Sequence, residues 1–412
     1  MTDRVPLFDR AAEAALFQRP DGAVSGHAFL ADIGRVAASL PAGSYLLNQC
    51  RDRYAFAVAF AAGLITGRTA LLNGGPAEAA AFAGAVSVDD TCLDAPPAAP
   101  AACAAIPCDH LAAIVFTSGS TGAPMAHEKR WGSLVQRSRA GGAAFGLAGG
   151  TIIGTIPPQH MYGFETTILL PFHADVSSWC GPAFFPGDMP AALAACPAPR
   201  VLVTTPLHLR TLLDSGAVLD LRIVVSATAP LDPALAARAE AAWRAPVHEI
   251  FGATECGSIA HRRTTASEVW TAYPGVTLAL DDAGAVVTAA FADPVRLADV
   301  LDAAPGGFRL IGRRTDVVKL AGRRASLPGL NRVLLDVAGV DDGAFVMPDE
   351  ADARLVAVVV APGRTGAAIL SDLRQVMEPI FLPRRVIQVD RLPRNALGKL
   401  PRHALLALLA RA

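Results

Sequence analysis

The chain has 412 residues, enough for two or three domains, and hydrophobic residues make up 52% of it, enough to fill a large core. Lys and Arg total 36 against 37 Asp and Glu, so the net charge of −1 gives no general field for nucleic acid or an anionic membrane surface. This composition argues against a disordered chain, and we expect no nucleic-acid partner.

The cysteines and the N-terminus indicate a cytoplasmic protein. Seven cysteines form an odd set without a Cys-x-x-Cys pair, which is a poor match to a disulfide framework or a zinc site and fits a reducing cytosol. The first residues lack the long apolar segment of a signal peptide, and no stretch approaches the roughly 20 apolar residues of a membrane span. The abundance of alanine is typical of a high-GC bacterial coding bias, so we expect a bacterial protein with no membrane partner.

Helices and strands alternate in the first hundred residues. Apolar residues at helical spacing predict helices over 27–40 and 52–67, and short apolar runs predict strands over 44–50 and 69–73. Such alternation predicts a parallel sheet with helices on its faces. The Ala/Pro-rich residues 93–107 are too poor in β-branched residues for a strand and predict an irregular surface connection.

Four later hydrophobic runs each end in Ser, Thr, Pro or His. They occupy residues 112–122, 150–160, 200–213 and 221–231. Ligands bind at the carboxyl ends of strands in an open α/β sheet, so we expect the four loops to converge on one crevice.

The character of the chain changes at Gly312, where "GRRTDVVKLAGRR" concentrates Arg and Lys. We therefore predict an N-terminal domain of residues 1–312 and a C-terminal domain of residues 313–412, which is near the usual domain size. The expected C-terminal elements are a strand pair at 343–348 and 353–362, an amphipathic helix at 369–377 and a polar tail.

The hexapeptide "TSGSTG" after a predicted strand has the composition of an anion-binding loop. Thr117, Ser118, Ser120 and Thr121 offer hydroxyls, and the glycines let the backbone curl around an anion without a Cβ clash. The pattern does not fit GxxxxGK[ST], which disfavours a Walker-type NTPase. From this segment alone, a Ser/Gly surface turn stays open as the alternative.

A second segment, "EIFGATECGS", is compatible with metal and phosphate binding. It places Thr254 and Glu255 just after Gly252, at the end of a predicted strand. A hydroxyl there can meet phosphate oxygens and a carboxylate can hold Mg²⁺. Taken alone the signal is weak, because glutamate after a strand is commonplace.

Five motifs occur together in the order and rough spacing of the adenylate-forming (AMP-binding) superfamily, which the chain resembles from about Phe29 to Leu405. They are "TSGSTGAP", "PPQHMYG", "FGATE", "GRRTDVVKLAG" and "LPRNALGKLPR". This superfamily includes acyl- and aryl-CoA ligases and nonribosomal adenylation domains. The resemblance implies an α/β fold with a large N-terminal domain of stacked α/β subdomains and a small, mobile α+β C-terminal domain.

The resemblance also implies a site for ATP and Mg²⁺. Thr117 to Gly122 would form the loop on the β and γ phosphates, and Phe251 takes the place of the tyrosine that stacks on adenine. Thr254 and Glu255 would hold phosphate and Mg²⁺. The other implied nucleotide-binding residues are Ser118, Gly119, Ser120, Thr121, Gly252, Ala253, Ala227 and Thr228 of "SATAPL", Asp299 for the ribose hydroxyls and Arg313 for ribose or phosphate.

Two residues carry the implied chemistry. Attack of a carboxylate on the α-phosphate brings two anions together, and the mobile ammonium of Lys399 in "LPRxxxGK" would bridge both in the transition state. His160 in "PPQHMYG" would lie at the floor of the acyl pocket, contact the substrate carboxylate and open the path for the thiol. The open alternatives are a solvated surface lysine and a loop histidine that caps a helix.

The C-terminal domain would rotate between two half-reactions. Arg314, Thr315 and Asp316 fill the hinge, and rotation would remove Lys399 and present Lys319 and Gly322 to the thiol channel. The acceptor would be CoA or the phosphopantetheine thiol of an acyl carrier protein. Short stand-alone members with "PPQHMYG" resemble ligases of fatty-acid-like or aryl-polyene pigment synthases, where a carrier protein is the natural partner.

The chain departs from the family at the phosphate loop. Met125 stands where a lysine usually follows the proline, and we expect Lys129 in "AHEKRW" to supply the charge from a different point. The segment before the loop is about fifty residues shorter than is common. Trp179, Phe184 and Phe185 would either shape the acid cavity or belong to the core.

These features predict an ATP-dependent carboxylic acid ligase acting on a small aryl or fatty acid. Benzoates, cinnamates and medium chains all stay open. Two alternatives also stay open: a non-catalytic nucleotide-binding relative, and an adenylate-forming enzyme with a different second step, such as a reductase or a luciferase-like oxygenase.

Overall fold

The computed structural model describes residues 3–118, 124–281, 284–313, 317–348, 354–393, 400 and 402–409. It divides into two compact units. The first unit comprises Met1–Ala279, Val286–Val295 and Pro305–Gly307, and the second comprises Leu280–Ala285, Arg296–Ala304 and Phe308–Ala412. In the part of the chain that the structure describes, no helix has the length and apolar character needed to cross a membrane.

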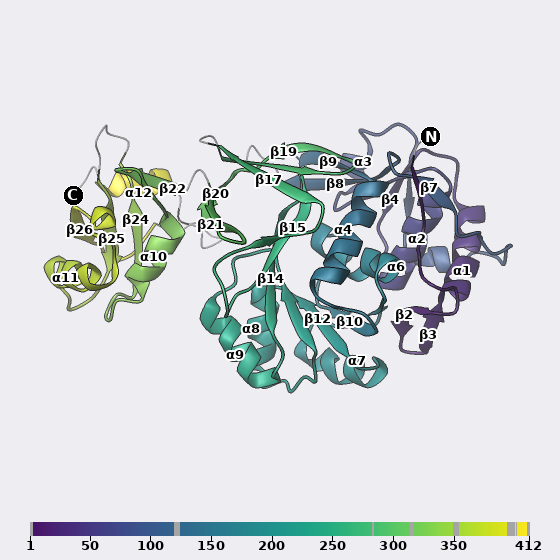
Figure 1. The fold of residues 1–412 in the computed structure, drawn as a ribbon, viewed down its shortest axis with the longest axis horizontal. Helices are drawn as coiled ribbons and strands as arrows, with labels where there is room; N and C mark the ends of the chain where they lie inside the picture. Colours follow the sequence, from purple (N-terminus) through teal and green to yellow (C-terminus); the bar gives the residue numbers. More distant parts are fainter. Residues whose placement is uncertain are drawn as a thin grey trace. The chain divides into compact units, whose positions relative to one another are not determined.

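The first unit is built on a nine-stranded sheet in the order β16-β15-β14-β13-β12-β10-β11-β2-β3 (Figure 1). Its six central strands are parallel, and an antiparallel pairing closes each end. The central strands β10, β11 and β13 are buried along their whole length, as expected for a parallel sheet covered on both faces. The strands are β2 (Ala15–Arg19), β3 (Gly22–Ser25), β10 (Gly150–Gly154), β11 (Val176–Trp179), β12 (Arg200–Thr204), β13 (Ile223–Ser226), β14 (Val247–Ala253), β15 (Gly257–Arg263) and β16 (Thr271–Ala272).

A separate five-stranded sheet has the order β6-β4-β5-β8-β9. Its strands are β4 (Tyr45–Asn48), β5 (Thr69–Leu72), β6 (Ala85–Val88), β8 (Leu111–Ser118) and β9 (Pro124–Arg130). The predicted phosphate loop joins β8 to its antiparallel neighbour β9. The four polar loops do not all follow strands of one sheet: three follow β10, β12 and β13, and the fourth belongs to the five-stranded sheet. Their convergence on one crevice stays a prediction.

Helices fill the space between the two sheets and cover their outer faces. α2 buries twelve of its thirteen residues, as expected for a helix that is apolar on all sides. The α7, α8 and α9 helices pack with the central strands of the nine-stranded sheet in one hydrophobic cluster (Figure 1). The helical segments are α1 (Gly26–Ser39), α2 (Arg53–Ile65), α3 (Pro76–Ala79), η1 (Asp90–Asp94), α4 (Trp131–Ala144), α5 (Met161–Gly163), the π-helix η2 (Phe164–Leu169), α6 (Leu170–His173), η3 (Pro186–Asp188), α7 (Met189–Ala195), α8 (Pro206–Asp214) and α9 (Pro233–Trp243).

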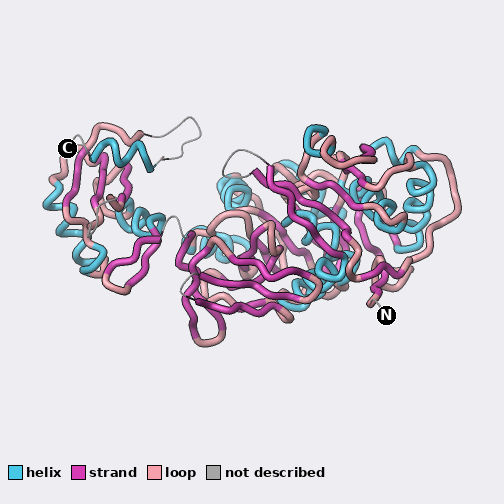
Figure 2. The backbone as a smooth tube through the Cα atoms, turned by 90° about the horizontal axis from the view of Figure 1, so that it is seen from above, coloured by secondary structure: helices cyan, strands magenta, loops and turns pink. Residues whose placement is uncertain are grey.

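The second unit has a core of its own, with helices beside a three-stranded sheet (Figure 2). Its first two strand pairs are β20 (Asp299–Ala304) with β21 (Gly307–Arg313), and β22 (Val317–Leu320) with β23 (Arg323–Ser326). The other elements are α10 (Leu327–Leu335), β24 (Asp342–Val346), β25 (Val356–Val360), α11 (Gly366–Val376), η5 (Pro379–Phe381), β26 (Arg385–Gln388) and α12 (Arg402–Leu409). The remaining small sheets pair β1 (Arg4–Pro6) with β7 (Ala105–Pro107), and join β17 (Val276–Asp281), β18 (Gly284–Ala289) and β19 (Ala292–Arg296).

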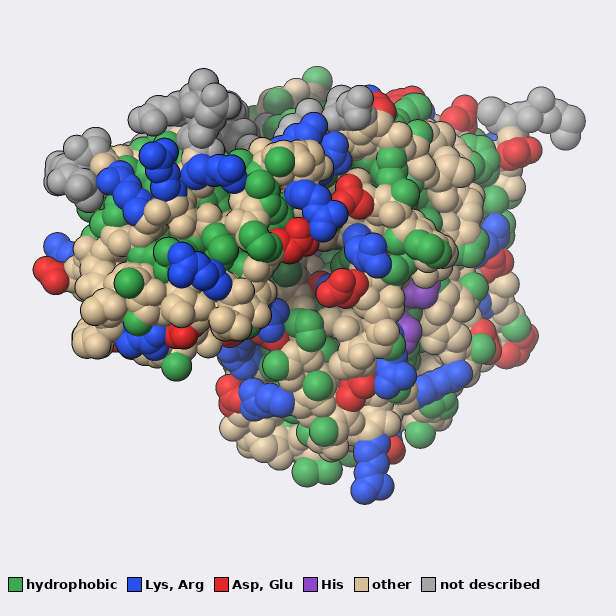
Figure 3. Space-filling view, turned by 60° about the vertical axis from the view of Figure 1, so that its left-hand side comes forward, with side chains coloured by type: hydrophobic (Ala, Val, Ile, Leu, Met, Phe, Trp, Pro, Cys, Tyr) green, Lys and Arg blue, Asp and Glu red, His purple; other side chains and the backbone are tan. Residues whose placement is uncertain are grey.

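Two predictions about local structure are wrong. The Ala/Pro-rich connection ends in the strand β7, because Ile106 is buried opposite β1. The expected polar tail contains the helix α12, because Leu405 packs against Val346 and Val358. On the face shown in Figure 3, basic and acidic side chains are interspersed with apolar ones, which agrees with the balanced net charge.

The histidine pair of β14 and β15 predicts a pH dependence of stability. Burial, together with the nearby His261, lowers the pKa of His248 from 6.5 to about 4. An unfolded chain binds this proton at the higher pKa, so the free energy of unfolding should fall as the pH drops from about 6.5 to about 4. Urea unfolding at several pH values should show a weaker decline for His248→Phe, while His27→Gln, on the exposed side of α1, should follow the wild type. Equal declines in all three proteins would contradict this assignment.

Candidate active site

Three polar segments meet at the carboxyl edge of the nine-stranded sheet. They follow β10, β12 and β13, which are adjacent and parallel. The Thr155 hydroxyl lies 2.9 Å from the Thr204 hydroxyl and 2.9 Å from His208 Nδ1. The Ala227 amide also donates to the Thr204 carbonyl, at 3.3 Å. The loops of this edge are therefore joined by short hydrogen bonds, as a preformed ligand site requires.

The "PPQHMYG" segment turns tightly from β10 into α5 and then into the π-helix η2. A Cβ atom on Gly163 would lie only 2.1 Å from the Pro157 carbonyl oxygen, so no other residue fits there without movement. The Tyr162 hydroxyl donates to the Val225 carbonyl at 2.8 Å and fixes the segment to β13. His160 is exposed and stands at the start of α5, where its side chain makes no capping bond in the described structure.

A buried cation lies beneath this segment, and the sequence reasoning missed it. Arg53, at the start of α2, donates to the carbonyl oxygens of Gly154 at 3.1 Å, Ile156 at 2.9 Å and Trp179 at 3.2 Å. Burial lowers its pKa, and no described carboxylate pairs with it. A single arginine within an otherwise apolar helical pattern was the signal that could have pointed to it.

The "SATAPL" loop after β13 has a strained backbone. Thr228 has φ of +81°, a conformation that β-branched residues rarely adopt. The Glu249 carboxylate accepts the Leu231 amide at 2.8 Å and the Arg262 guanidinium at 2.7 Å, which holds the far end of the loop. Strain kept in place by such anchors is typical of functional sites.

The phosphate-loop hairpin is described on both sides of its tip. Thr117 on β8 is opposite Met125 on β9, and its hydroxyl lies 3.0 Å from Nε2 of His127, two residues further along β9. Burial lowers the pKa of His127, and the nearby Lys129 ammonium lowers it further. Gly119, Ser120, Thr121, Gly122 and the Ser118 side chain lie outside the described residues.

Lys129 connects the two sheets. Its side chain rises from β9 of the five-stranded sheet, is 6% exposed, and donates from Nζ to the Glu255 carbonyl oxygen at 2.8 Å. Burial lowers its pKa, and the carboxylate of Glu165 opposes that shift. Met125, at the family's usual lysine position, is exposed. The strand that follows the predicted phosphate loop and the predicted magnesium loop are thus neighbours.

The "FGATE" segment ends β14 with an irregular pairing to β15 between Phe251 and Gly252. The Phe251 ring is buried and packs on Trp270, with centroids 5.5 Å apart. Ala253, Thr254 and Glu255 are half-buried. A carboxylate beside a hydroxyl is a hard oxygen donor set that suits Mg²⁺, which takes few protein ligands when phosphates and water complete its shell.

The remaining predicted residues belong to the second unit or lie outside the described chain. Asp299 begins β20, and Arg313 ends β21 with its side chain outside the description. Lys319 is exposed on β22, and Ala321 and Gly322 form the two-residue turn to β23 with φ of +45° and +81°. Lys399, Arg314, Thr315 and Asp316 lie outside the described residues, so their predicted roles stay predictions, as does the boundary at residue 313.

Comparison with known proteins identifies the family. The family model described as AMP-binding enzyme matches residues 41–295, and the model described as AMP-binding enzyme C-terminal domain matches residues 330–399. The chain belongs to the AMP-binding enzyme family. It is therefore a member of the adenylate-forming ligases, as the five motifs predicted.

Relatives of this AMP-binding enzyme include a 4-coumarate–CoA ligase from Halorhodospira halophila. The two are 30% identical over 309 residues, which cover 71% of this chain and 75% of the relative. The structure resembles apo MatB from Rhodopseudomonas palustris, with a TM-score of 0.76, 20% identity and coverage of 98% and 97% of the two chains. It also resembles o-succinylbenzoate CoA synthetase (MenE) from Bacillus subtilis, with a TM-score of 0.76, 16% identity and coverage of 97% and 99%. These similarities confirm the predicted α/β fold with a large N-terminal and a smaller C-terminal domain.

The close approach at Gly163 predicts a strong effect of one methyl group. In this AMP-binding enzyme, Gly163→Ala should lower the free energy of unfolding by about 1–3 kcal/mol, because the new Cβ meets the Pro157 carbonyl. Gly187→Ala is the matched control, since nothing lies within 4 Å of a Cβ at that position. Urea unfolding of both variants measures the difference, and an unperturbed Gly163→Ala protein would show that the turn is not tightly packed.

Proposed function

We propose that this chain is an ATP-dependent carboxylic acid ligase. A carboxylate attacks the α-phosphate of ATP to give an acyl-adenylate and pyrophosphate, and a phosphopantetheine thiol then displaces AMP to give a thioester. The observation that carries the proposal is the bond from Lys129 to the Glu255 carbonyl, which brings the strand after the phosphate loop against the loop with Thr254 and Glu255. Membership of the family and the relative named as a CoA ligase support the same reading.

The nucleotide side of the site uses residues from both sheets. Thr117 and the loop to Gly122 bind the β and γ phosphates, and Thr254 and Glu255 hold phosphate and Mg²⁺. Mg²⁺ held by these residues would supply neutralisation of the phosphate charge. The B. subtilis synthetase, which has a similar fold, was solved in complex with ATP and a magnesium ion. Phe251 and the strained Ala227–Thr228 backbone flank the adenine, Asp299 binds the ribose and Arg313 reaches ribose or phosphate.

The acid side of the site is apolar at its rim. Phe185 is 72% exposed after β11, and Leu207 is 70% exposed at the start of α8, after β12. Since β11 and β12 flank β10, these side chains lie on loops on either side of the segment that carries His160. Large apolar side chains beside a titratable group favour an aryl or fatty acid over a small polar one. Trp179 is instead buried in the core, and its indole donates to the Pro182 carbonyl at 3.0 Å.

The second half-reaction requires the C-terminal domain. Lys399 binds the reacting anions during adenylation, and rotation about Arg314, Thr315 and Asp316 then withdraws it. Lys319 and Gly322 next line the channel for the thiol. The exposed, two-residue turn at Ala321 and Gly322 supports this role, because a thiol arm can approach a turn without side chains in its way. The thiol belongs to CoA or to an acyl carrier protein.

A screen of acids tests the proposed function. Pyrophosphate release is measured with benzoates, cinnamates and medium-chain fatty acids, with CoA and phosphopantetheinylated carrier protein as separate acceptors. Release that depends on an apolar acid and on ATP, followed by thioester formation with either acceptor, is the expected result. No turnover with any acid while ATP still binds would favour a non-catalytic relative, and acyl-adenylate without thioester would favour a different second step.

Lys399→Ala separates the two half-reactions. Adenylation should fall by roughly 100-fold or more, because the bridging ammonium acts only while two anions approach each other. Thioester formation from supplied acyl-adenylate should be retained, since Lys399 has left the site by then. Single-turnover assays of each step measure this split, with Arg374→Ala on the exposed side of α11 as a control. Equal losses in both steps would contradict the rotation.

A further inference from the structure

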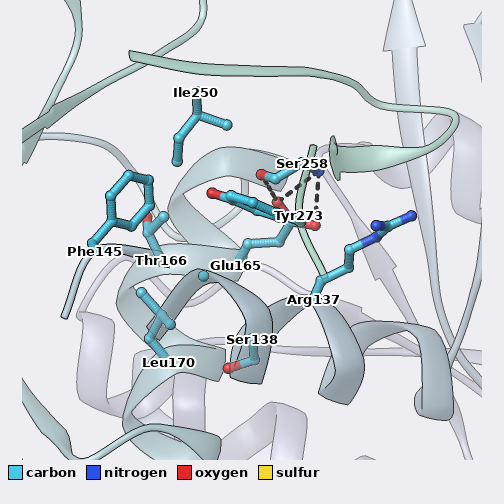
Figure 4. A pocket seen from close by; sticks show the side chains of 10 residues that line it. Arg137, Ser138, Phe145, Glu165, Thr166, Leu170, Ile250, Ser258 and Tyr273 are labelled. Carbon is cyan, nitrogen blue, oxygen red and sulfur yellow. Dashed lines mark hydrogen bonds between the residues drawn. The ribbon is translucent and has the colours of Figure 1, made fainter. Parts of the chain in front are cut away.

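Three buried ionisable side chains lie behind the loop that joins β14 to β15. Lys129 is 6% exposed on β9, Arg137 is 5% exposed on α4, and Glu165 is 6% exposed on the π-helix η2. Burying a charged group is costly unless it is compensated, so such a cluster from three separate elements requires a reason. Figure 4 shows Arg137, Glu165, Ser258 and Tyr273 around one small space.

The cluster holds both flanks of the loop. On one flank the Lys129 ammonium donates to the Glu255 carbonyl at 2.8 Å. On the other flank Glu165 accepts the backbone amide of Ser258 at 3.2 Å and also its hydroxyl (Figure 4). The residues between these bonds are only Cys256 and Gly257. The backbone just after Thr254 and Glu255 is therefore fixed by side chains rather than by sheet pairing alone.

Gly257 is shaped by the same contact. Its φ is +73°, and a Cβ atom there would lie 2.6 Å from Glu165 Oε1. Only glycine, which has no Cβ atom, lets the backbone approach the carboxylate this closely. A Cβ at Gly252 would in turn meet the Gly257 carbonyl at 2.5 Å, so the two glycines of "FGATECG" fit the loop around Glu165.

Burial and the neighbouring charged groups shift the pKa of Glu165 in opposite directions. Burial raises the pKa of Glu165, and the bonds from Ser258 and the charges of Arg137 and Lys129 oppose that rise. The adjoining space has a volume of about 20 Å³, which is room for one water molecule but not for an organic ligand. The cluster therefore acts on the protein's own loop and is not a second substrate pocket.

We propose that Glu165 and Lys129 are positioning residues that clamp the Thr254–Cys256 loop and so set the place of the Glu255 carboxylate. Glu165 lies five residues after His160, so the clamp also ties the acid-binding segment to the magnesium loop. This inference rests on the proposed function for its catalytic consequence, but the clamp itself is a property of the unliganded chain. It assigns Lys129 to the loop backbone and not to the phosphates of ATP.

Hydrogen exchange in the absence of ligand tests the clamp directly. Exchange of the backbone amides over 254–258 should be about 10- to 100-fold faster in Lys129→Met and in Glu165→Leu, because each loses a bond made by a charged group. Glu165→Gln keeps one carbonyl acceptor for Ser258 and should retain most of the protection. The control is Glu240→Gln on α9, which removes a carboxylate paired with Arg263 at the end of β15. It should leave exchange in the loop unchanged.

Kinetics then test the consequence for the reaction. The clamp variants should lose acid-dependent exchange of pyrophosphate into ATP by about 10- to 100-fold and should keep thioester formation from supplied acyl-adenylate, which does not use the magnesium loop. The double variant Lys129→Met/Glu165→Leu should lose less than the product of the single losses, because both residues hold one loop.

The outcomes separate the clamp from the proposed function. A wild-type protein without pyrophosphate exchange for any acid would refute the function, while amide exchange would still decide the clamp. Weaker ATP binding in Lys129→Met with unchanged loop exchange would show that Lys129 binds the nucleotide itself, and would overturn the clamp. Faster exchange throughout the first unit in Lys129→Met would also overturn it, since the role would then be general stability. If Glu165→Leu does not fold, Lys129→Met and Glu165→Gln decide the question.

Discussion

The bond between the Lys129 ammonium and the Glu255 carbonyl joins two sheets that share no strand. The phosphate-loop hairpin belongs to the five-stranded sheet and the "FGATE" loop to the nine-stranded sheet. Strand pairing alone does not bring the two motifs together. The contact requires a buried ammonium, and burial alone would favour the neutral amine. The carboxylate of Glu165 opposes this lowering of the pKa of Lys129, and the bond to a backbone carbonyl satisfies one of the donors of the ammonium.

The acid-binding segment is held by a different means, in which carbonyl groups replace carboxylates. Arg53 donates to three backbone carbonyls around the end of β10 and after β11, and the Tyr162 hydroxyl donates to a fourth on β13. Arg53 is thus solvated mainly by carbonyl groups, and the neighbouring Asp52 carboxylate acts on its charge without a hydrogen-bonded ion pair between them in the described structure. The same side chain therefore fixes the backbone at this edge of the sheet and contributes a positive potential there.

The alternation of helices and strands, the motifs and the family could be predicted from the sequence, because they depend on local pattern. The assignment of β8 to a second sheet could not, since a strand's pattern does not record which neighbour it pairs with. Glu165 and Arg53 were missed for a related reason. A lone charge within "FETTILL" or "RYAFAVAF" is ambiguous until its tertiary partners are known. Those partners are backbone carbonyls for Arg53, and for Glu165 they are the Ser258 amide and hydroxyl, distant in the chain. Strand β7 and helix α12 could not be predicted either, because they depend on the packing of Ile106 and Leu405 against apolar residues distant in the chain.

The departure at Met125 gains a physical meaning from these contacts. A lysine directly after the loop would be exposed, as Met125 is, and its charge would be screened by water and salt. Lys129 instead lies within the protein, where the lower effective dielectric strengthens each interaction of its charge. That charge acts on the Glu255 backbone and on Glu165, groups that are already ordered before any nucleotide arrives. Lys129 thus holds a positive charge within a preorganised scaffold, whereas a charge at the position of Met125 would be exposed to water, and preorganisation lowers the cost of arranging charges.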